Sequence, residues 1–242
     1  MLGCTYQREH KVVGWHLHET QGEFKALTAI PGPGRADELW MVTKRVVSGA
    51  DHFYVERMED EFTGTRADEG RFLDSHVVIA PTSEVITGLE HLEGLEVDIL
   101  ADGTVHPPRT VAGGQITLDD TYTEIVVGLQ YISEVRPYLS QVPKQDGSSH
   151  GRMQRITDVD IDFYKSLGGY IGKYDSEDGD SEEELVFRVP ADLMGQQVPL
   201  FSGIYHYNFL EGFDRDAEYF IRQKQPLPMT VRGVVDTVEV FT

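Results

Sequence analysis

The sequence predicts an all-β fold of small antiparallel barrel or sandwich modules, with long loops and few or no helices. Apolar and polar residues alternate over many short segments, which is the period of a half-buried strand. Windows with apolar residues three and four apart are broken by glycine, proline or β-branched runs, so amphipathic helices are not indicated. Strand-like segments follow one another at a spacing of about ten residues, which is typical of small barrels and sandwiches.

In the first half of the chain, alternation predicts strands over residues 12–18, 38–47, 52–58, 76–80, 84–87, 95–101, 115–118 and 123–129. The second and third of these are separated by the turn-forming sequence Ser48-Gly49-Ala50-Asp51, which predicts a hairpin. Asp102-Gly103 and Gly113-Gly114 supply the chemistry for further tight turns.

In the second half, a polar, turn-rich stretch predicts a linker or long loop over residues 138–151. Residues 153–167 then alternate apolar and polar side chains, which indicates a strand with one wet face. Further strands are expected over 184–189, 203–208, 217–224 and 229–241. The predicted organisation is an N-terminal β segment (1–50) that can join the C-terminal part, a small barrel-like module (51–137), the linker (138–151) and a C-terminal β module (152–242).

The charge balance excludes several classes of partner. The chain has 41 Asp plus Glu against 21 Lys plus Arg, a formal net charge of −20. Such a surface repels phosphate, so a basic patch that grips nucleic acid or an anionic membrane is not expected. No run of about eighteen apolar residues predicts a membrane span, and residues 1–11 do not resemble a secretory signal. Cys4 is the only cysteine, which excludes an intramolecular disulfide and a thiolate zinc cluster.

Two histidines form a weak candidate metal site. His16 and His18 lie two positions apart on one face of the predicted strand, and such a pair can chelate zinc or copper if a third ligand comes from elsewhere. The preferred alternative is two half-exposed imidazoles opposite a buried Trp15 and Leu17. His106 is expected in a loop and is a weaker candidate. We therefore expect neither a metal site nor a cofactor.

Residues 175–184 form an acidic tract that contains Asp175, Glu177, Asp178, Asp180, Glu182, Glu183 and Glu184. The tract does not follow the ligand order of an EF-hand, so a solvated acidic loop is favoured over a calcium site. The carboxylate-rich residues 57–69 are interpreted in the same way.

Signatures of catalysis are missing from the sequence. It contains no Gly-x-Ser-x-Gly turn for a nucleophile, and Cys4 has no local signature of one. Pro31-Gly32-Pro33-Gly34 lacks the Lys-Ser/Thr of a nucleotide loop. An enzyme is therefore not expected.

An ordered set of phrases runs along most of the chain: CTYQRE (4–9), VGWH (13–16), DELWMV (37–42), YVERM (54–58), FLDS (72–75), ITGLEHLEG (86–94), LADGTVH (100–106), LFSG (200–203), GFDRD (212–216) and PLPMTV (226–231). In this order they resemble the tail nozzle, or tail tubular protein B, of short-tailed bacteriophages. Nozzle proteins of this type are much longer, with a large N-terminal region that includes β-propeller structure. The resemblance therefore covers mainly their C-terminal part.

The resemblance implies a structural virion protein, assembled in the host cytoplasm, that forms a homohexameric ring in the phage tail. Its implied partners are other copies of itself, the portal adaptor, and other tail proteins or fibres. Genomic DNA would pass through the ring without specific binding, and an acidic wall would repel and centre the duplex. The acidic tract 175–184 is the candidate lumen-facing loop. The alternative is a β-rich tail module that docks fibres or binds a host glycan, and a tail-associated hydrolase would require a cleft with convergent titratable groups.

Overall fold

The computed structural model describes residues 1–32, 37–138, 151–174, 181–189, 197–209, 212–215 and 217–241, and the backbone of 143–144 and 147–148. The chain divides into two compact units. The first comprises Met1–Thr63 and Arg71–Tyr131, and the second comprises Gly64–Gly70 and Ile132–Thr242. Residues 1–50 thus lie in the first unit, and the expected boundary between residues 50 and 51 falls at the start of a strand in the middle of a hairpin.

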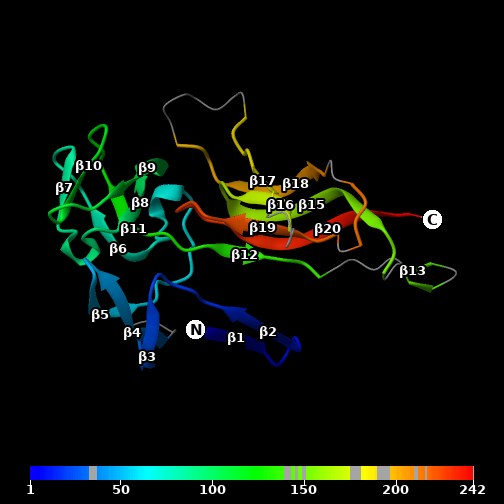
Figure 1. Cartoon of the computed structure of the whole chain (residues 1–242), viewed down its shortest axis with the longest axis horizontal. Helices are drawn as coiled ribbons and strands as arrows, with labels where there is room; N and C mark the ends of the chain where they lie inside the picture. Colours follow the sequence, from blue (N-terminus) through cyan, green and yellow to red (C-terminus); the bar gives the residue numbers. More distant parts are fainter. Residues whose placement is uncertain are drawn as a thin grey trace. The chain divides into compact units, whose positions relative to one another are not determined.

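Two small antiparallel sheets begin the first unit. Strands β1 (Leu2–Gln7) and β2 (Val12–Leu17) form a two-stranded ribbon, drawn in dark blue in Figure 1. Strand β4 (Asp37–Val47) lies between β3 (Glu23–Pro31) and β5 (Ala50–Arg57). The predicted β4–β5 hairpin is confirmed: Val47 faces Ala50, and Ser48 and Gly49 form a two-residue turn with φ of 51° and 78°.

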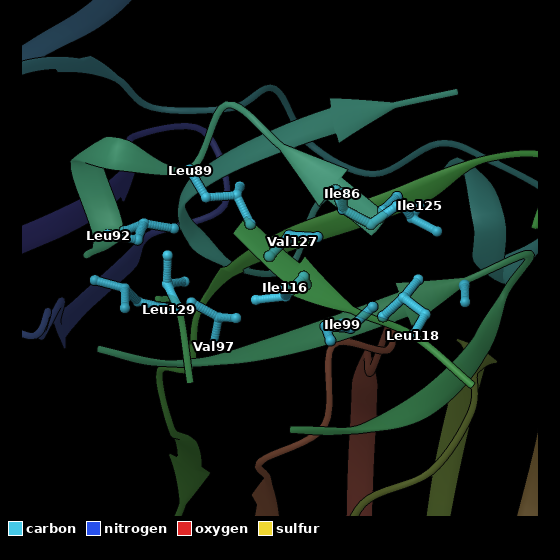
Figure 2. Close-up of a cluster of buried hydrophobic side chains, with 12 residues drawn as sticks. Ile86, Leu89, Leu92, Val97, Ile99, Ile116, Leu118, Ile125, Val127 and Leu129 are labelled. Carbon is cyan, nitrogen blue, oxygen red and sulfur yellow. The ribbon is translucent and has the colours of Figure 1, made fainter. Parts of the chain in front are cut away.

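The rest of the first unit encloses an apolar core. Strands β6 (Asp74–Ile79), β11 (Ile125–Leu129), β8 (Glu96–Ala101) and β9 (Thr104–Thr110) form one sheet in that order, and β7 (Val85–Thr87) pairs with β10 (Gln115–Thr117). Figure 2 shows side chains of these strands and of the 3-10 turn η2 (Glu90–Leu92) pointing toward one another. All five residues of β11 are buried, because this strand lies between β6 and β8 and is covered by the core.

The second unit packs two sheets around a second core. Strands β12 (Ser133–Val135), β19 (Tyr219–Gln223), β16 (Tyr170–Lys173) and β17 (Ser181–Glu184) form one sheet in that order. Strand β15 (Gln154–Ser166) lies between β18 (Phe201–Asn208) and β20 (Val231–Val240) in the other. Both sheets contribute to one apolar cluster. Ile161 and Phe163 come from β15 of the three-stranded sheet, and Ile171 and Ile221 come from β16 and β19 of the four-stranded sheet. A short hairpin, β13 (Pro143–Lys144) with β14 (Gly147–Ser148), and the 3-10 turn η1 (Ala67–Glu69) complete the described elements.

The predicted all-β class is confirmed. The described residues form several small antiparallel sheets, and in the strand orders of this part of the chain no sheet closes into a barrel. Within the same ranges, neither helical turn has the length and apolar composition of a membrane-spanning segment.

Several local predictions were wrong. Residues 181–184 were expected in a solvated loop but form β17, and residues 185–189, expected in a strand, have no regular structure. His106 was expected in a loop but is buried in β9. Strands β1, β3, β9, β12, β13, β14 and β16 were not predicted at all, and the short hairpin β13–β14 falls within the expected linker 138–151.

Candidate interaction surfaces

The β1–β2 hairpin has one apolar face that is open to solvent. Paired residues of an antiparallel ribbon lie on the same face, and the register places six such side chains together: Leu2, Cys4, Tyr6, Val13, Trp15 and Leu17. We call this set the Trp15 face. Trp15 is 68% exposed and Tyr6 is 66% exposed. The expectation that Trp15 and Leu17 are buried is therefore wrong, and both faces of the ribbon, the apolar one included, are open to solvent.

The opposite face of the hairpin is mainly polar and carries His16. The His16 imidazole lies across Gly3, where an added Cβ would come within 2.3 Å of Nε2, so only glycine allows this approach. The His16 and His18 rings meet edge to face, with centroids 4.8 Å apart. In the described part of the chain, no group of three or more His, Cys, Asp or Glu side chains is placed to hold a metal ion.

The β3–β4–β5 sheet exposes a second apolar face. Its register brings together Ile30, Trp40, Val42, Val46, Phe53 and Val55, which we call the Phe53 face. Phe53 is 63% exposed and Val55 is 70% exposed. Lys44 lies on the same face and pairs with Asp51 at 2.8 Å. The face is thus an apolar surface with paired charges.

The other face of the same sheet is covered by the first unit itself. Arg45 points to this side, is 2% exposed, and donates three hydrogen bonds to the Glu56 carboxylate, from Nη2 at 2.9 and 3.1 Å and from Nε at 3.2 Å. Its other amino group donates to Thr20 Oγ1 at 2.8 Å and to the Gln21 carbonyl at 2.7 Å. The Tyr54 hydroxyl donates to the His91 carbonyl at 3.1 Å. On this side Met41, Thr43, Arg45 and Val47 of β4 are buried, although Leu27 of β3 is 54% exposed. The Phe53 face is therefore the more open side of the sheet.

A row of aspartates marks the outer face of the β18–β15–β20 sheet. Asp158, Asp160 and Asp162 alternate along β15 with the buried Val159 and Ile161, so all three point away from the core. The row is partly neutralised. The His206 Nδ1 lies 2.6 Å from Asp160 Oδ1, and Arg232 Nη2 lies 2.5 Å from Asp162 Oδ1.

His206 predicts a pH dependence of stability. The hydrogen bond with Asp160 raises the pKa of His206 above the ordinary 6.5. The charges of Asp160 and Asp158 and a hydrogen bond with Asn208 also raise this pKa, and desolvation opposes them. A raised pKa means that the stabilisation is fully present below pH 6.5 and is lost as pH rises through the folded-state pKa. Comparing unfolding midpoints of the wild type and His206→Gln from about pH 5 to about pH 9 should give a difference that is largest in acid. Asp160→Asn should reproduce this loss, and a pH-independent difference would contradict the assignment.

The structure describes three of the seven candidate lumen-facing acids, all on the edge strand β17. Glu182 pairs with Lys224 and accepts from Arg222 Nη1 at 3.2 Å. Glu183 accepts from the Tyr207 hydroxyl at 2.8 Å, and Glu184 from the Gln225 amide at 3.1 Å. These three carboxylates are therefore bonded to residues of the second unit itself. The other four, Asp175, Glu177, Asp178 and Asp180, lie outside the described residues.

His106 is packed among residues of the first unit. Its ring is buried in the edge strand β9, with Nε2 at 3.3 Å from Asp119 Oδ2, and it is perpendicular to the Tyr122 ring at a centroid distance of 6.1 Å. Cys4 is exposed on the Trp15 face with its Sγ beside the Thr5 carbonyl.

No family model matches this chain, and no curated protein is similar enough to it to count as a relative. Its function is inferred from its residues and their geometry. The features that the sequence alone did not reveal are the two exposed apolar faces. Alternation signalled that each strand has an apolar side, but not that this side would remain open.

Proposed function

We propose that the chain is a structural protein of a short phage tail, a subunit of the nozzle ring below the portal and adaptor through which the genome is ejected. The observation that carries the proposal is the pair of exposed apolar sheet faces, the Trp15 face and the Phe53 face. Chains that work as monomers rarely expose large contiguous apolar patches, and such patches are typical of subunit interfaces. The ordered sequence phrases, which resemble nozzle proteins, indicate which kind of assembly these faces would serve.

The charge of the chain suits such a ring. A ring of six copies with a formal charge of −20 each presents DNA with a wall that repels phosphate, so the duplex can slide without being held. In this proposal the other copies of the chain, the adaptor and the fibres are its partners. The chain acts by assembly and not by catalysis.

The oligomeric state of the purified chain tests this function. We expect light scattering after size exclusion to give a closed oligomer, with a hexamer as the specific expectation, and electron micrographs to show rings with a central pore. A monomer at all concentrations, with no ring in micrographs or in virions, would overturn the proposal. Binding of a host glycan by a monomer would favour the alternative of a glycan-binding tail module.

The acidic tract gives a second prediction. Changing Asp175, Glu177, Asp178 and Asp180 to serine should slow genome ejection severalfold if these side chains line the channel. Residues 181–184 are kept in this variant because they form β17. Glu182→Gln is the matched control, since it removes a carboxylate that pairs with Arg222 and Lys224 and should affect stability instead. Ejection measured by fluorescence of released DNA at the wild-type rate would place the tract away from the channel.

A further inference from the structure

We propose that the Trp15 face of one copy packs on the Phe53 face of a second copy. This contact deepens the proposed ring, because it names the surfaces by which neighbouring subunits would join.

The hairpin needs a partner. In the described residues, β1 and β2 pair with each other and with no third strand. A single two-stranded hairpin is marginally stable in water, and it becomes stable when its apolar face packs on another layer. At the base of the ribbon Met1 and His18 exchange two hydrogen bonds, from the Met1 amino group to the His18 carbonyl at 2.6 Å and from the His18 amide to the Met1 carbonyl at 2.8 Å. The open Trp15 face is therefore the surface that a partner would cover.

The two faces match in size and chemistry. Aromatic side chains such as Tyr6 and Trp15 can bury about 150–250 Å² each, and Leu2, Val13 and Leu17 extend the same surface. Together they offer several hundred Å², which approaches the roughly 800 Å² per partner of a standard interface. The Phe53 face presents six residues of similar character on three strands. Packing one on the other buries both sets as the two layers of a sandwich.

The charges beside the two faces do not oppose contact between copies. Arg8, Glu9 and Lys11 lie in the turn between β1 and β2, outside the Trp15 face. On the Phe53 face Lys44 pairs with Asp51 and Arg57 pairs with Glu38. Burying the two apolar faces against one another therefore strands no described charge of either face. A second copy supplies both apolar faces.

The contact is head to tail. Because the two faces are different surfaces of one chain, each copy would bind one neighbour with its hairpin and another with its sheet. Contacts of this kind close into a ring when the rotation between neighbours fits, and otherwise extend into a filament. A reciprocal contact, in which two copies exchange hairpins, would instead give a two-fold dimer, and the oligomeric state in solution distinguishes the two arrangements.

Cross-linking between differently tagged copies tests the contact, because Cys4 is the only cysteine and lies on the Trp15 face. A wild-type chain is mixed with a second chain carrying Cys4→Ser and Val55→Cys, and both are exposed to oxidised glutathione. We expect a disulfide between the two tags. The matched control replaces Val78, exposed on β6 of the same unit, in place of Val55 and should give no such product.

Other outcomes overturn the proposal. A Cys4–Cys4 disulfide in the wild type alone would mean that hairpin packs on hairpin. An intrachain disulfide in Val55→Cys with Cys4 retained would mean that the hairpin folds back on its own sheet. No disulfide in any mixture of folded chains, as judged by circular dichroism, would remove the contact.

Substitution separates this contact from the proposed tail function. Trp15→Ser should weaken self-association by about ten- to thirty-fold in sedimentation equilibrium, as expected for a central aromatic of an interface. His16→Ser, on the opposite face of the same strand, should leave association unchanged. Rings that form in Trp15→Ser would refute the contact but keep the nozzle. The expected cross-link in a chain that is missing from virions would refute the nozzle but keep the contact.

Discussion

Replacing Arg45 with alanine is expected to lower the free energy of unfolding of the first unit by about 3–5 kcal/mol. The guanidinium is 2% exposed and holds both oxygens of Glu56, the Thr20 hydroxyl and the Gln21 carbonyl. Without it, the partly buried Glu56 carboxylate and the Gln21 carbonyl lose their hydrogen-bond donor. Both groups then remain desolvated with no hydrogen bond from Arg45 to offset the cost. The loss is larger than that of an exposed ion pair because water cannot readily replace the missing partner.

The effect of this substitution should depend on pH. Burial alone would raise the pKa of Glu56, but hydrogen bonds from Arg45 and Ser75 and the charge of Arg45 hold it below the ordinary 4.5. A lowered pKa means that this stabilisation is present above pH 4.5 and is lost as pH falls through the folded-state pKa. The difference between wild type and Arg45→Ala should therefore shrink in acid.

Urea unfolding followed by tryptophan fluorescence measures the loss. Trp15 and Trp40 are the two tryptophans of the chain and both belong to the first unit, so the signal reports on that unit. Arg57→Ala is the matched control: it lies on the same sheet, its side chain is 37% exposed, and its pair with Glu38 should contribute less than about 1 kcal/mol. Equal stability of Arg45→Ala and wild type would refute the assigned role of the buried pair.

Replacing Phe163 with alanine is expected to cost the second unit about 3–5 kcal/mol. The ring is fully buried on the central strand β15, and it meets Phe187 edge to face at 5.4 Å and Tyr205 at 6.4 Å between centroids. Alanine removes the buried apolar surface and leaves a cavity between the two sheets that the rigid strands cannot close. Phe163→Leu keeps most of the volume and should cost much less.

Hydrogen exchange separates the two units in this experiment. Amides of β15 should lose protection in Phe163→Ala, while those of β8 in the first unit should keep theirs. Tyr164→Ala is the neighbouring control, since Tyr164 is 44% exposed and such a surface change usually costs about 0.5 kcal/mol or less. Unchanged protection of β15 would show that Phe163 does not stabilise the core around it.

The strands that the sequence predicted well have one face on a core. In β15, Ile161 and Phe163 alternate with Asp160 and Asp162, and the structure buries the first pair and exposes the second. Burial on one side and water on the other produce the period-two pattern directly. Strand β20 alternates in the same way, and the predicted bounds of β4, β8 and β20 differ from the observed ones by at most two residues at each end.

The strands that were missed lie mostly at sheet edges. Pro107 and Pro108 argued against a strand in β9, but an edge strand has free N–H positions where proline is tolerated, and β9 is at the edge of its sheet. The acids of β17 argued for a solvated loop, but this strand is also an edge, and its Glu182 meets Arg222 and Lys224 across the sheet. Edge strands follow their neighbours and carry little pattern of their own.

From the residues alone follow the β class, the β4–β5 turn and the excess of negative charge. Those features depend on local backbone preference and on composition, which are properties of short segments. Only the tertiary structure decides which apolar sides are covered. Met41 and Trp40 are neighbours on one alternating strand, and the Met41 side packs inside the first unit while the Trp40 side belongs to an open face. Alternation defines two faces, and contacts between distant segments determine which of them remains free to bind.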